Sequence, residues 1–278
     1  MSLQNGNAIR FLHGHIIISG ILSCQSGIFI GGAEDTLQIG GVDKSVIRNP
    51  LTGEPYIPGS SLKGKLRSIT ERIVTAAHNQ PLRANRPGGD RERKVWRHEC
   101  DDFGDAKTCQ LCRVFGATGS VATNDNYPGA LLVRDSTLFN KDDLLQDGLP
   151  IIETKMENAI DRLTSAAHPR TFERVPAGAQ FAFELIYRIE TLETATKNPN
   201  PTIDSQRVKV DITNLLNAME ILEKDGLGGN ISRGYGSIEF VVEKFQSYDI
   251  NNNPMSCGFK TGNGQSLSAC KGLIPSLI

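Results

Sequence analysis

The sequence predicts an α+β fold, and two repeating patterns support this prediction. Runs of β-branched or alternating apolar residues, typical of strands, occupy residues 9–23, 130–139 and 180–189. Apolar residues spaced three and four apart, typical of amphipathic helices, occupy residues 62–78 and 205–224. With 278 residues and a hydrophobic share of 38 %, the chain can form a core without disulfides.

Composition narrows the classes of function. The formal net charge is −1, which does not favour a generic nucleic-acid binder. No apolar run approaches the roughly 20 residues needed to cross a bilayer, and no secretory signal precedes residue 25. We therefore expect a soluble, cytoplasmic protein without a membrane partner. Six cations nevertheless fall within residues 83–97, which predicts either a solvated loop or an edge that contacts phosphate.

The segment 39–72 combines a glycine pair, a proline-bounded turn and the start of a helix. Ser60 and Ser61 lie where oxygen atoms that cap a helix are needed. A helix N-terminus beside glycine and several cations favours binding of a phosphate group. The cations that lie off the apolar stripe are Lys63, Lys65, Arg67 and Arg72.

Gly59, Gly64 and Lys65 also satisfy G-x-x-x-x-G-K, the first seven positions of a nucleotide-binding P-loop. The eighth position needs a hydroxyl that binds magnesium, and here it is Leu66. The preceding segment GEPYIP is a poor central strand, because its two prolines cannot donate ladder hydrogen bonds. The sequence therefore disfavours a nucleotide-hydrolysing P-loop.

An insertion rich in charges and turn-forming residues spans residues 80–125. A span of fifteen residues inside this insertion holds four potential metal ligands, namely His98, Cys100, Cys109 and Cys112. A redox C-x-x-C would need to open a helix after a strand, and a disulfide is disfavoured in the cytosol. We therefore predict structural Zn²⁺ with tetrahedral Cys3His coordination.

Some polar residues have both a structural and a functional interpretation. His13 and His15 share one face of the first predicted strand, beside bulges predicted at Gly14 and Gly20. A structural role for the two histidines is favoured over contact with RNA. From residue type alone, Asp43 beside a glycine pair is more typical of an Asx turn than of a catalytic group.

A glycine-rich segment spans residues 228–236, between the second predicted helix and a further strand. Its glycines allow backbone amides to approach a phosphate closely. Arg233 supplies a charge there, and Tyr235 supplies an aromatic surface on which a base could stack. Residues 249–278 are rich in Asn, Gly and Ser and poor in aromatics, so we expect a mobile tail.

Three separate segments carry a family pattern. The first, at residues 40–71, is GGVDKSVIRNPLTGEPYIPGSSLKGKLRSITE. The second is K-x-E-x-x-I-D-R at 155–162, followed by R-x-x-E-x-V-P-x-G at 170–178, and the third is G-x-x-S-R-G-Y-G-x-I at 229–238. Together they resemble the RAMP superfamily of CRISPR-associated proteins, in particular the repeated backbone subunit of type III (Csm-type) effector complexes.

The resemblance implies a modified ferredoxin-like (RRM-like) core within a single domain at residues 7–248. The insertion at 80–125 becomes a zinc-binding lobe, which some members of the family carry. Residues 163–175 become a β-hairpin thumb that intrudes between nucleotides of the guide–target duplex. The mobile tail then begins at residue 249.

The resemblance also implies a function in antiviral defence. The chain is expected to bind crRNA as a filament of its own copies, together with other type III effector subunits, and to cleave complementary target RNA at regular intervals. Asp43 falls on the aspartate implicated in that cleavage, for which Mg²⁺ or another divalent ion is expected. The residues expected to contact RNA are Lys63, Lys65, Arg67, Arg162, Arg170, Gly229, Ser232, Arg233, Gly234 and Tyr235.

Two other functions remain open from the sequence. The first is a filament scaffold that binds RNA but does not cut it, in which Asp43 is inert. The second is a guide-processing ribonuclease of the same superfamily that needs no metal and uses a histidine as general base. His13 and His15 are the candidates for that base.

Overall fold

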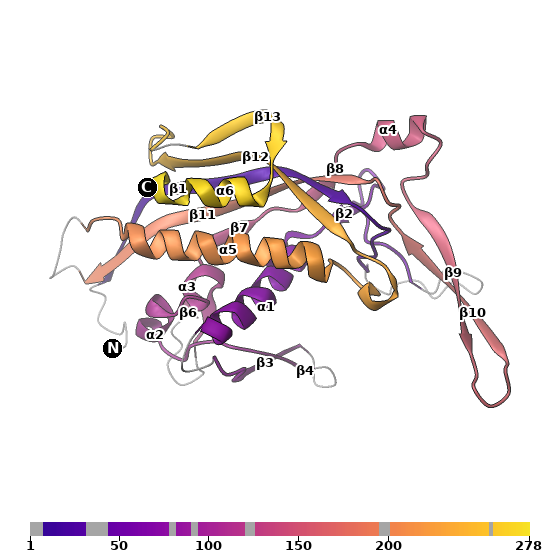
Figure 1. The fold of residues 1–278 in the computed structure, drawn as a ribbon. Helices are drawn as coiled ribbons and strands as arrows, with labels where there is room; N and C mark the ends of the chain where they lie inside the picture. Colours follow the sequence, from indigo (N-terminus) through magenta and orange to yellow (C-terminus); the bar gives the residue numbers. More distant parts are fainter. Residues whose placement is uncertain are drawn as a thin grey trace.

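A central antiparallel sheet forms the body of the molecule (Figure 1). The computed structural model describes residues 8–31, 44–77, 82–89, 94–119, 126–194, 201–255 and 258–278. The strand order is β13-β12-β1-β11-β8-β2, and β7 also pairs with β11. These strands are β1 (Ala8–Cys24), β2 (Tyr56–Ile57), β7 (Leu131–Val133), β8 (Ser136–Leu138), β11 (Gln180–Thr194), β12 (Ile238–Asp249) and β13 (Phe259–Gln265).

The 17-residue strand β1 is the centre of this sheet. It pairs with β11 along one edge and with β12 along the other. The bulges predicted at Gly14 and Gly20 are confirmed, because the pairing register shifts at both places. A Cβ atom at either glycine would collide with a backbone carbonyl of β12, so only glycine allows this close approach.

Two long helices pack against the sheet, α1 (Gly59–Ala77) and α5 (Ser205–Asp225) (Figure 1). Both were predicted from their periodicity, and their apolar stripes are buried in the core. The Asp204 carboxylate accepts a hydrogen bond from the Arg207 amide and so caps the start of α5. At its other end, Gly226 takes a φ of +83°, a positive value that glycine adopts without strain.

A β-hairpin projects from the sheet and is formed by β9 (Glu153–Ile160) and β10 (Ala167–Arg174) (Figure 1). We call this hairpin the thumb. The predicted segment 163–175 covers only its turn and its second strand, because the hairpin runs from Glu153 to Arg174. In the turn, the Asp161 carboxylate accepts hydrogen bonds from the amides of Leu163 and Thr164 at 2.9 and 2.8 Å.

The predicted strand at 130–139 is interrupted, because it forms the separate strands β7 and β8. Asp135 lies between them, and its carboxylate accepts a hydrogen bond from the Gly59 amide at 2.7 Å. The chain therefore turns here to cap the N-terminus of α1. The acidic segment that follows was expected to be a turn and instead forms the short helix α4 (Lys141–Gln146).

The expectation of a mobile tail from residue 249 is wrong. These residues form β13, the helix α6 (Leu267–Leu273) and the short 3₁₀ helix η2 (Ile274–Ser276). Composition alone concealed an apolar stripe whose side chains are buried against α5 and β12. The residues of this stripe are Leu267, Cys270, Ile274 and Leu277.

The described residues of the inserted lobe, and those just after it, form short elements, and a buried ion pair joins the lobe to the core. The elements are β3 (Arg86–Gly89), β4 (Lys94–Arg97), α2 (Phe103–Thr108), α3 (Cys112–Phe115), β5 (Ala117–Thr118) and β6 (Asn126–Tyr127). Arg113 of α3 donates to both carboxylate oxygens of Asp211 in α5, at 2.6 to 2.9 Å. The Tyr187 hydroxyl donates to the same carboxylate at 2.8 Å. Among the helices in the described ranges, none has the length and apolar character needed to cross a membrane.

We predict that Asp211→Ala lowers the free energy of unfolding by about 3–5 kcal/mol, because it leaves the Arg113 charge buried without its partner. Urea unfolding followed by circular dichroism measures this change. Glu184→Ala is the matched control, since Glu184 pairs with Arg134 at 3.6 Å on the surface, and such a pair contributes under about 1 kcal/mol. Equal losses in the two variants would contradict the prediction.

Candidate functional site

The cations at the start of α1 are engaged within the chain. The Lys63 ammonium donates to the Leu131 carbonyl at 2.9 Å, and burial lowers the pKa of Lys63. Lys65 lies 3.6 Å from the Asp225 carboxylate. Because the Asp135 carboxylate caps this helix terminus, a bound phosphate would meet a like charge there. The contacts of this terminus therefore also disfavour a P-loop.

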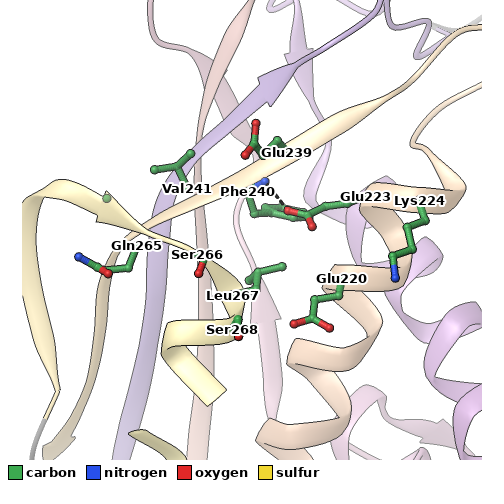
Figure 2. Close-up of a pocket in the computed structure, with 11 residues that line it drawn as sticks. Glu220, Glu223, Lys224, Glu239, Phe240, Val241, Gln265, Ser266, Leu267 and Ser268 are labelled. Atoms are coloured by element: carbon green, nitrogen blue, oxygen red, sulfur yellow. Dashed lines mark hydrogen bonds between the residues drawn. The ribbon is translucent and has the colours of Figure 1, made fainter. Parts of the chain in front are cut away.

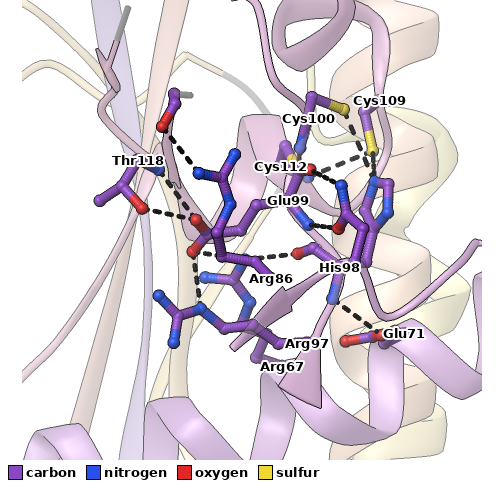
Figure 3. A network of polar contacts seen from close by, with 12 residues as sticks. Arg67, Glu71, Arg86, Arg97, His98, Glu99, Cys100, Cys109, Cys112 and Thr118 are labelled. Atoms are coloured by element: carbon purple, nitrogen blue, oxygen red, sulfur yellow. Dashed lines mark hydrogen bonds and ion pairs between the residues drawn. The ribbon is translucent and has the colours of Figure 1, made fainter. Parts of the chain in front are cut away.

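Arg67 connects α1 to the inserted lobe (Figure 3). Its guanidinium donates to the His98 carbonyl at 3.0 Å and lies 3.5 Å from the Glu99 carboxylate. Glu99 is almost fully buried and also accepts hydrogen bonds from Arg97 and Thr118. Burial opposes ionisation of Glu99, yet these donors outweigh it and lower its pKa. Within the basic segment 83–97, Arg97 is therefore engaged in an ion pair inside the chain.

The four predicted metal ligands lie together in this lobe (Figure 3). Their ligand atoms are all within 4.8 Å of one another. The His98 Nε2 atom lies 3.6 Å from both the Cys100 and the Cys109 sulfur. Two ligands of a tetrahedral zinc ion are separated by about 3.6 Å, given the usual Zn–S and Zn–N bond lengths. The spacing of the cluster therefore fits a metal such as zinc.

Neighbouring polar groups orient the ligands of this cluster. The His98 Nδ1 atom lies 3.1 Å from the Arg83 carbonyl, an arrangement that keeps the proton on Nδ1 and leaves Nε2 for a metal. The Cys100 amide donates to the Cys112 sulfur at 3.4 Å, and the Cys112 amide donates to the Cys109 sulfur at 3.5 Å. Such donors stabilise thiolates, which are the form of cysteine that binds metal.

The glycine-rich segment after α5 folds back on its own start. We call residues 226–237 the glycine loop; it contains the short 3₁₀ helix η1 (Ile231–Arg233). The Gly229 amide donates to the Phe29 carbonyl at 2.8 Å. Ser232, Arg233 and Gly234 form the exposed rim of the loop, where backbone and guanidinium groups are accessible to a phosphate.

Tyr235 has a different environment from this rim, because it is 2 % exposed. Its hydroxyl donates to Glu157 of the thumb at 2.8 Å. Lys155 and Arg174 lie 4.6 and 5.2 Å from the ring centroid. Burial, together with the hydrogen bond to Glu157, raises the pKa of Tyr235 to about 12. The ring is thus covered by contacts inside the chain, and in this arrangement it is not accessible for stacking on a base.

The thumb presents both cationic and apolar side chains. Arg162 in the turn and Arg170 on β10 are exposed, as expected for contact with RNA. Large apolar side chains on the thumb, which sequence reasoning missed, are also exposed: Met156 by 76 %, Ile160 by 66 % and Leu163 by 96 %. Such residues in a polar hairpin were a signal for a surface that packs against bases.

Asp43 lies outside the described residues, but the chain that follows it is fixed to the thumb. The Lys44 carbonyl accepts a hydrogen bond from the Glu173 amide at 3.0 Å. The Glu173 carboxylate accepts hydrogen bonds from the Val46 amide at 3.0 Å and from Arg48 at 2.7 Å. The start of α1, the thumb and the glycine loop are the three places where the sequence predicted contacts with RNA. The last two are in direct contact.

A model of the RAMP superfamily matches residues 21–239, which is most of the chain. The chain belongs to the RAMP superfamily. It is 35 % identical over 226 residues to the CRISPR system Cms endoribonuclease Csm3 of Mycobacterium tuberculosis, covering 81 % of this chain and 86 % of the relative.

Solved structures show the same fold. The Methanopyrus kandleri Csm3 crystal structure matches with a TM-score of 0.57 and 23 % identity, over 87 % of this chain and 79 % of that chain. A crystal structure of the Csm3–Csm4 subcomplex in the type III-A CRISPR–Cas interference complex matches with a TM-score of 0.53 and 24 % identity, over 95 % and 97 %. The predicted RAMP fold, an α+β core with an inserted lobe and a thumb, is confirmed.

His13 and His15 lie in the N-terminal half of β1, whereas the glycine loop meets the chain just beyond the C-terminal end of this strand. His13 Nε2 is 2.9 Å from the Thr191 hydroxyl, and burial lowers the pKa of His13. The His15 ring stacks on Tyr248 with centroids 5.3 Å apart. Both rings therefore have structural contacts, which favours the structural interpretation over a catalytic base.

An acidic pocket of about 380 Å³ lies between α5, β12 and α6 (Figure 2). Its charged lining is Glu220, Glu223, Glu239 and Lys224. Glu223 accepts a hydrogen bond from the Phe240 amide at 2.8 Å, and burial raises its pKa. With three carboxylates and one ammonium group, this pocket repels phosphate and is a poor candidate for an RNA site.

We predict that the purified protein contains about one bound metal ion per chain and that Cys109→Ser removes it, because three ligands hold a structural metal far less tightly than four. Atomic emission spectrometry measures the metal content. Cys24→Ala is the control, since Cys24 is a buried free thiol outside the cluster and its loss should leave the metal content unchanged. Full metal content in Cys109→Ser would exclude this cluster as the binding site.

Proposed function

We propose that the chain is the crRNA-binding backbone subunit of a type III CRISPR effector complex and an endoribonuclease that cuts complementary target RNA. One observation carries the proposal: a relative with 35 % identity over 81 % of this chain bears the name CRISPR system Cms endoribonuclease Csm3. The three family motifs in the sequence support it, because they form the start of α1, the thumb and the glycine loop.

RNA contacts are assigned first to exposed groups. Ser232, Arg233 and Gly234 on the glycine-loop rim are suited to hold the guide backbone, with Gly229 fixing the loop behind them. On the thumb, Arg162 and Arg170 carry charge beside exposed apolar side chains. Sequence recognition is then left to base pairing between guide and target.

The cations of α1 are assigned an indirect role in RNA binding. The contacts of Lys63 with Leu131, of Lys65 with Asp225 and of Arg67 with His98 support a role in holding α1 in place. Tyr235 is likewise assigned a supporting role, since its ring lies between cations of the thumb.

The proposed cleavage uses the nucleophile that RNA itself carries. Asp43 helps to activate the ribose 2′-hydroxyl, and the thumb displaces the scissile nucleotide toward an in-line geometry. The products then carry a cyclic phosphate or a 3′-phosphate. The requirement for Mg²⁺ or another divalent ion rests on the family resemblance, and EDTA tests it directly.

The metal cluster is assigned structural Zn²⁺, held by His98, Cys100, Cys109 and Cys112. The support is the donor set and its spacing. All four side chains are occupied as ligands in this assignment, so the ion stabilises the inserted lobe and has no open position for a substrate.

The proposed partners are crRNA, complementary target RNA, further copies of this chain in a filament and other type III subunits. A solved structure with this fold is a Csm3–Csm4 subcomplex, which supports assembly with other subunits. The proposed role is in antiviral defence in the cytoplasm, where free thiols such as those of Cys24 and Cys270 persist.

We predict that Asp43→Ala lowers the rate of target cleavage by at least about 100-fold, because it removes a group that acts on the reacting 2′-hydroxyl. The measurement uses the guide-loaded assembly with a labelled complementary RNA and Mg²⁺, and resolves the cut positions on a gel. Target binding should be unchanged.

Asp142→Ala is the control for loss of an exposed carboxylate elsewhere, and it should cut at the parental rate. Undiminished cutting by Asp43→Ala would assign catalysis to another residue or subunit. A parent assembly that binds the target without cutting it would instead support the scaffold alternative.

A further inference from the structure

Tyr235 lies on an exposed loop and is nevertheless almost fully buried. Its neighbours Ser232, Arg233 and Gly234 are exposed, whereas Tyr235 retains only 2 % of its accessible surface. Gly234 and Gly236 flank it with φ of +83° and +77°. This positive φ on both sides turns the ring inward, and glycine adopts it at no steric cost.

The buried ring contacts both strands of the thumb near its base. The Lys155 ammonium of β9 lies 4.6 Å from the ring centroid, and the Arg174 guanidinium of β10 lies 5.2 Å from it. The hydroxyl donates to Glu157 Oε1 of β9 at 2.8 Å. Cation–π contacts and a hydrogen bond to a carboxylate are both strong when shielded from water. A displacement of the glycine loop is therefore transmitted to both strands.

The edge of β10 and the opposite face of the thumb base are held by a different segment. Successive side chains of a strand point to opposite faces, so Glu173 lies on the face opposite Arg174. The Glu173 amide donates to the Lys44 carbonyl at 3.0 Å, and its carboxylate accepts from the Val46 amide at 3.0 Å. Lys44 directly follows Asp43 in the sequence.

Arg233 is shared between the thumb and the surface. Its guanidinium lies 3.3 Å from Glu157 Oε2, and its side chain is 60 % exposed. The hydrogen bond from Tyr235, with the nearby Lys155 charge, lowers the pKa of Glu157, so the carboxylate stays ionised. A phosphate on the loop rim would compete for Arg233, whereas the bond between Tyr235 and Glu157 faces inward and is retained.

We propose that Tyr235 is a positioning residue that couples the glycine loop to the thumb and, through Glu173 and Lys44, to the segment that carries Asp43. The inference rests on the proposed function and adds to it a physical link between guide binding and thumb orientation. Tyr235 does not touch the target; it sets the position of groups that do.

Tyr235→Phe in the guide-loaded assembly tests the link, because it removes the hydroxyl and keeps the ring and its cation contacts. The single-turnover cleavage rate should fall between about 10- and 100-fold, the usual effect of misplacing reacting groups. The dissociation constants for guide and target should be unchanged, and the melting temperature should fall only slightly, since one hydrogen bond is lost while the ring stays packed.

Two further variants separate the effect of the hydrogen bond between Tyr235 and Glu157 from the effect of removing any tyrosine hydroxyl. Glu157→Gln keeps an acceptor oxygen for the Tyr235 hydroxyl and should lose less activity than Tyr235→Phe. Tyr248→Phe alters a tyrosine on β12 that stacks on His15, and it should cut at the parental rate.

Hydrogen exchange gives a readout that does not depend on cleavage. Guide binding to the parent should slow amide exchange in the thumb strands at 153–160 and 167–174, although RNA first meets the loop rim. In Tyr235→Phe this slowing should be lost or strongly reduced while the glycine loop itself remains protected.

Each outcome decides one of the two proposals. If Tyr235→Phe cuts at the rate of an active parent, the coupling is overturned and the proposed function stands. A rate that falls only in step with RNA affinity and melting temperature would give Tyr235 a purely structural role and also overturn the coupling. An inactive parent would overturn the proposed function, and the hydrogen-exchange comparison would then decide the coupling.

Discussion

Hydrogen bonding of β1 along both of its edges is the constraint on which the rest of the structure depends. Because β11 and β12 occupy the two edges, the connecting segments must leave at the ends of the strand. Just beyond β1, the Gln25 amide donates to the Ser237 carbonyl, and the Ile28 amide donates to the Val175 carbonyl. The glycine loop, the base of the thumb and the chain that leads toward Asp43 therefore meet at the C-terminal end of β1.

Features that depend on short-range geometry could be predicted from the sequence. The helices α1 and α5 follow from apolar periodicity, and the bulges at Gly14 and Gly20 follow from glycine within a strand. The metal cluster is also local, because His98 and Cys112 lie within one small lobe and the C-x-x-C spacing presents two sulfurs together. The thumb and the role proposed for Asp43 came from the family resemblance, since no local pattern specifies them.

Features that depend on distant partners could not be predicted. Tyr235 suggested a stacking surface because its sequence neighbours are polar, but its hydroxyl partner Glu157 is 78 residues away. The cap that Asp135 provides for α1 joins residues separated by 76 positions. The C-terminal helix was missed for another reason. The composition of residues 249–278 is dominated by the polar loop before the helix, and this concealed an apolar stripe that includes Leu267 and Leu277, both buried. Pairing and burial of this kind are decided by tertiary structure.

Several cations of this chain are bound to other groups of the same chain, and this affects how the chain would hold RNA. Lys63, Arg67 and Arg113 are bound to carbonyls or carboxylates of the same chain, so these three cations are not available to displace counterions from RNA phosphates. Affinity gained by counterion release scales with the number of phosphates neutralised, so each cation paired within the chain lowers the affinity that one copy alone can reach. In the proposed filament, affinity would accumulate from many weak contacts along a single guide. A short RNA fragment would then dissociate quickly, whereas a full-length guide would stay bound.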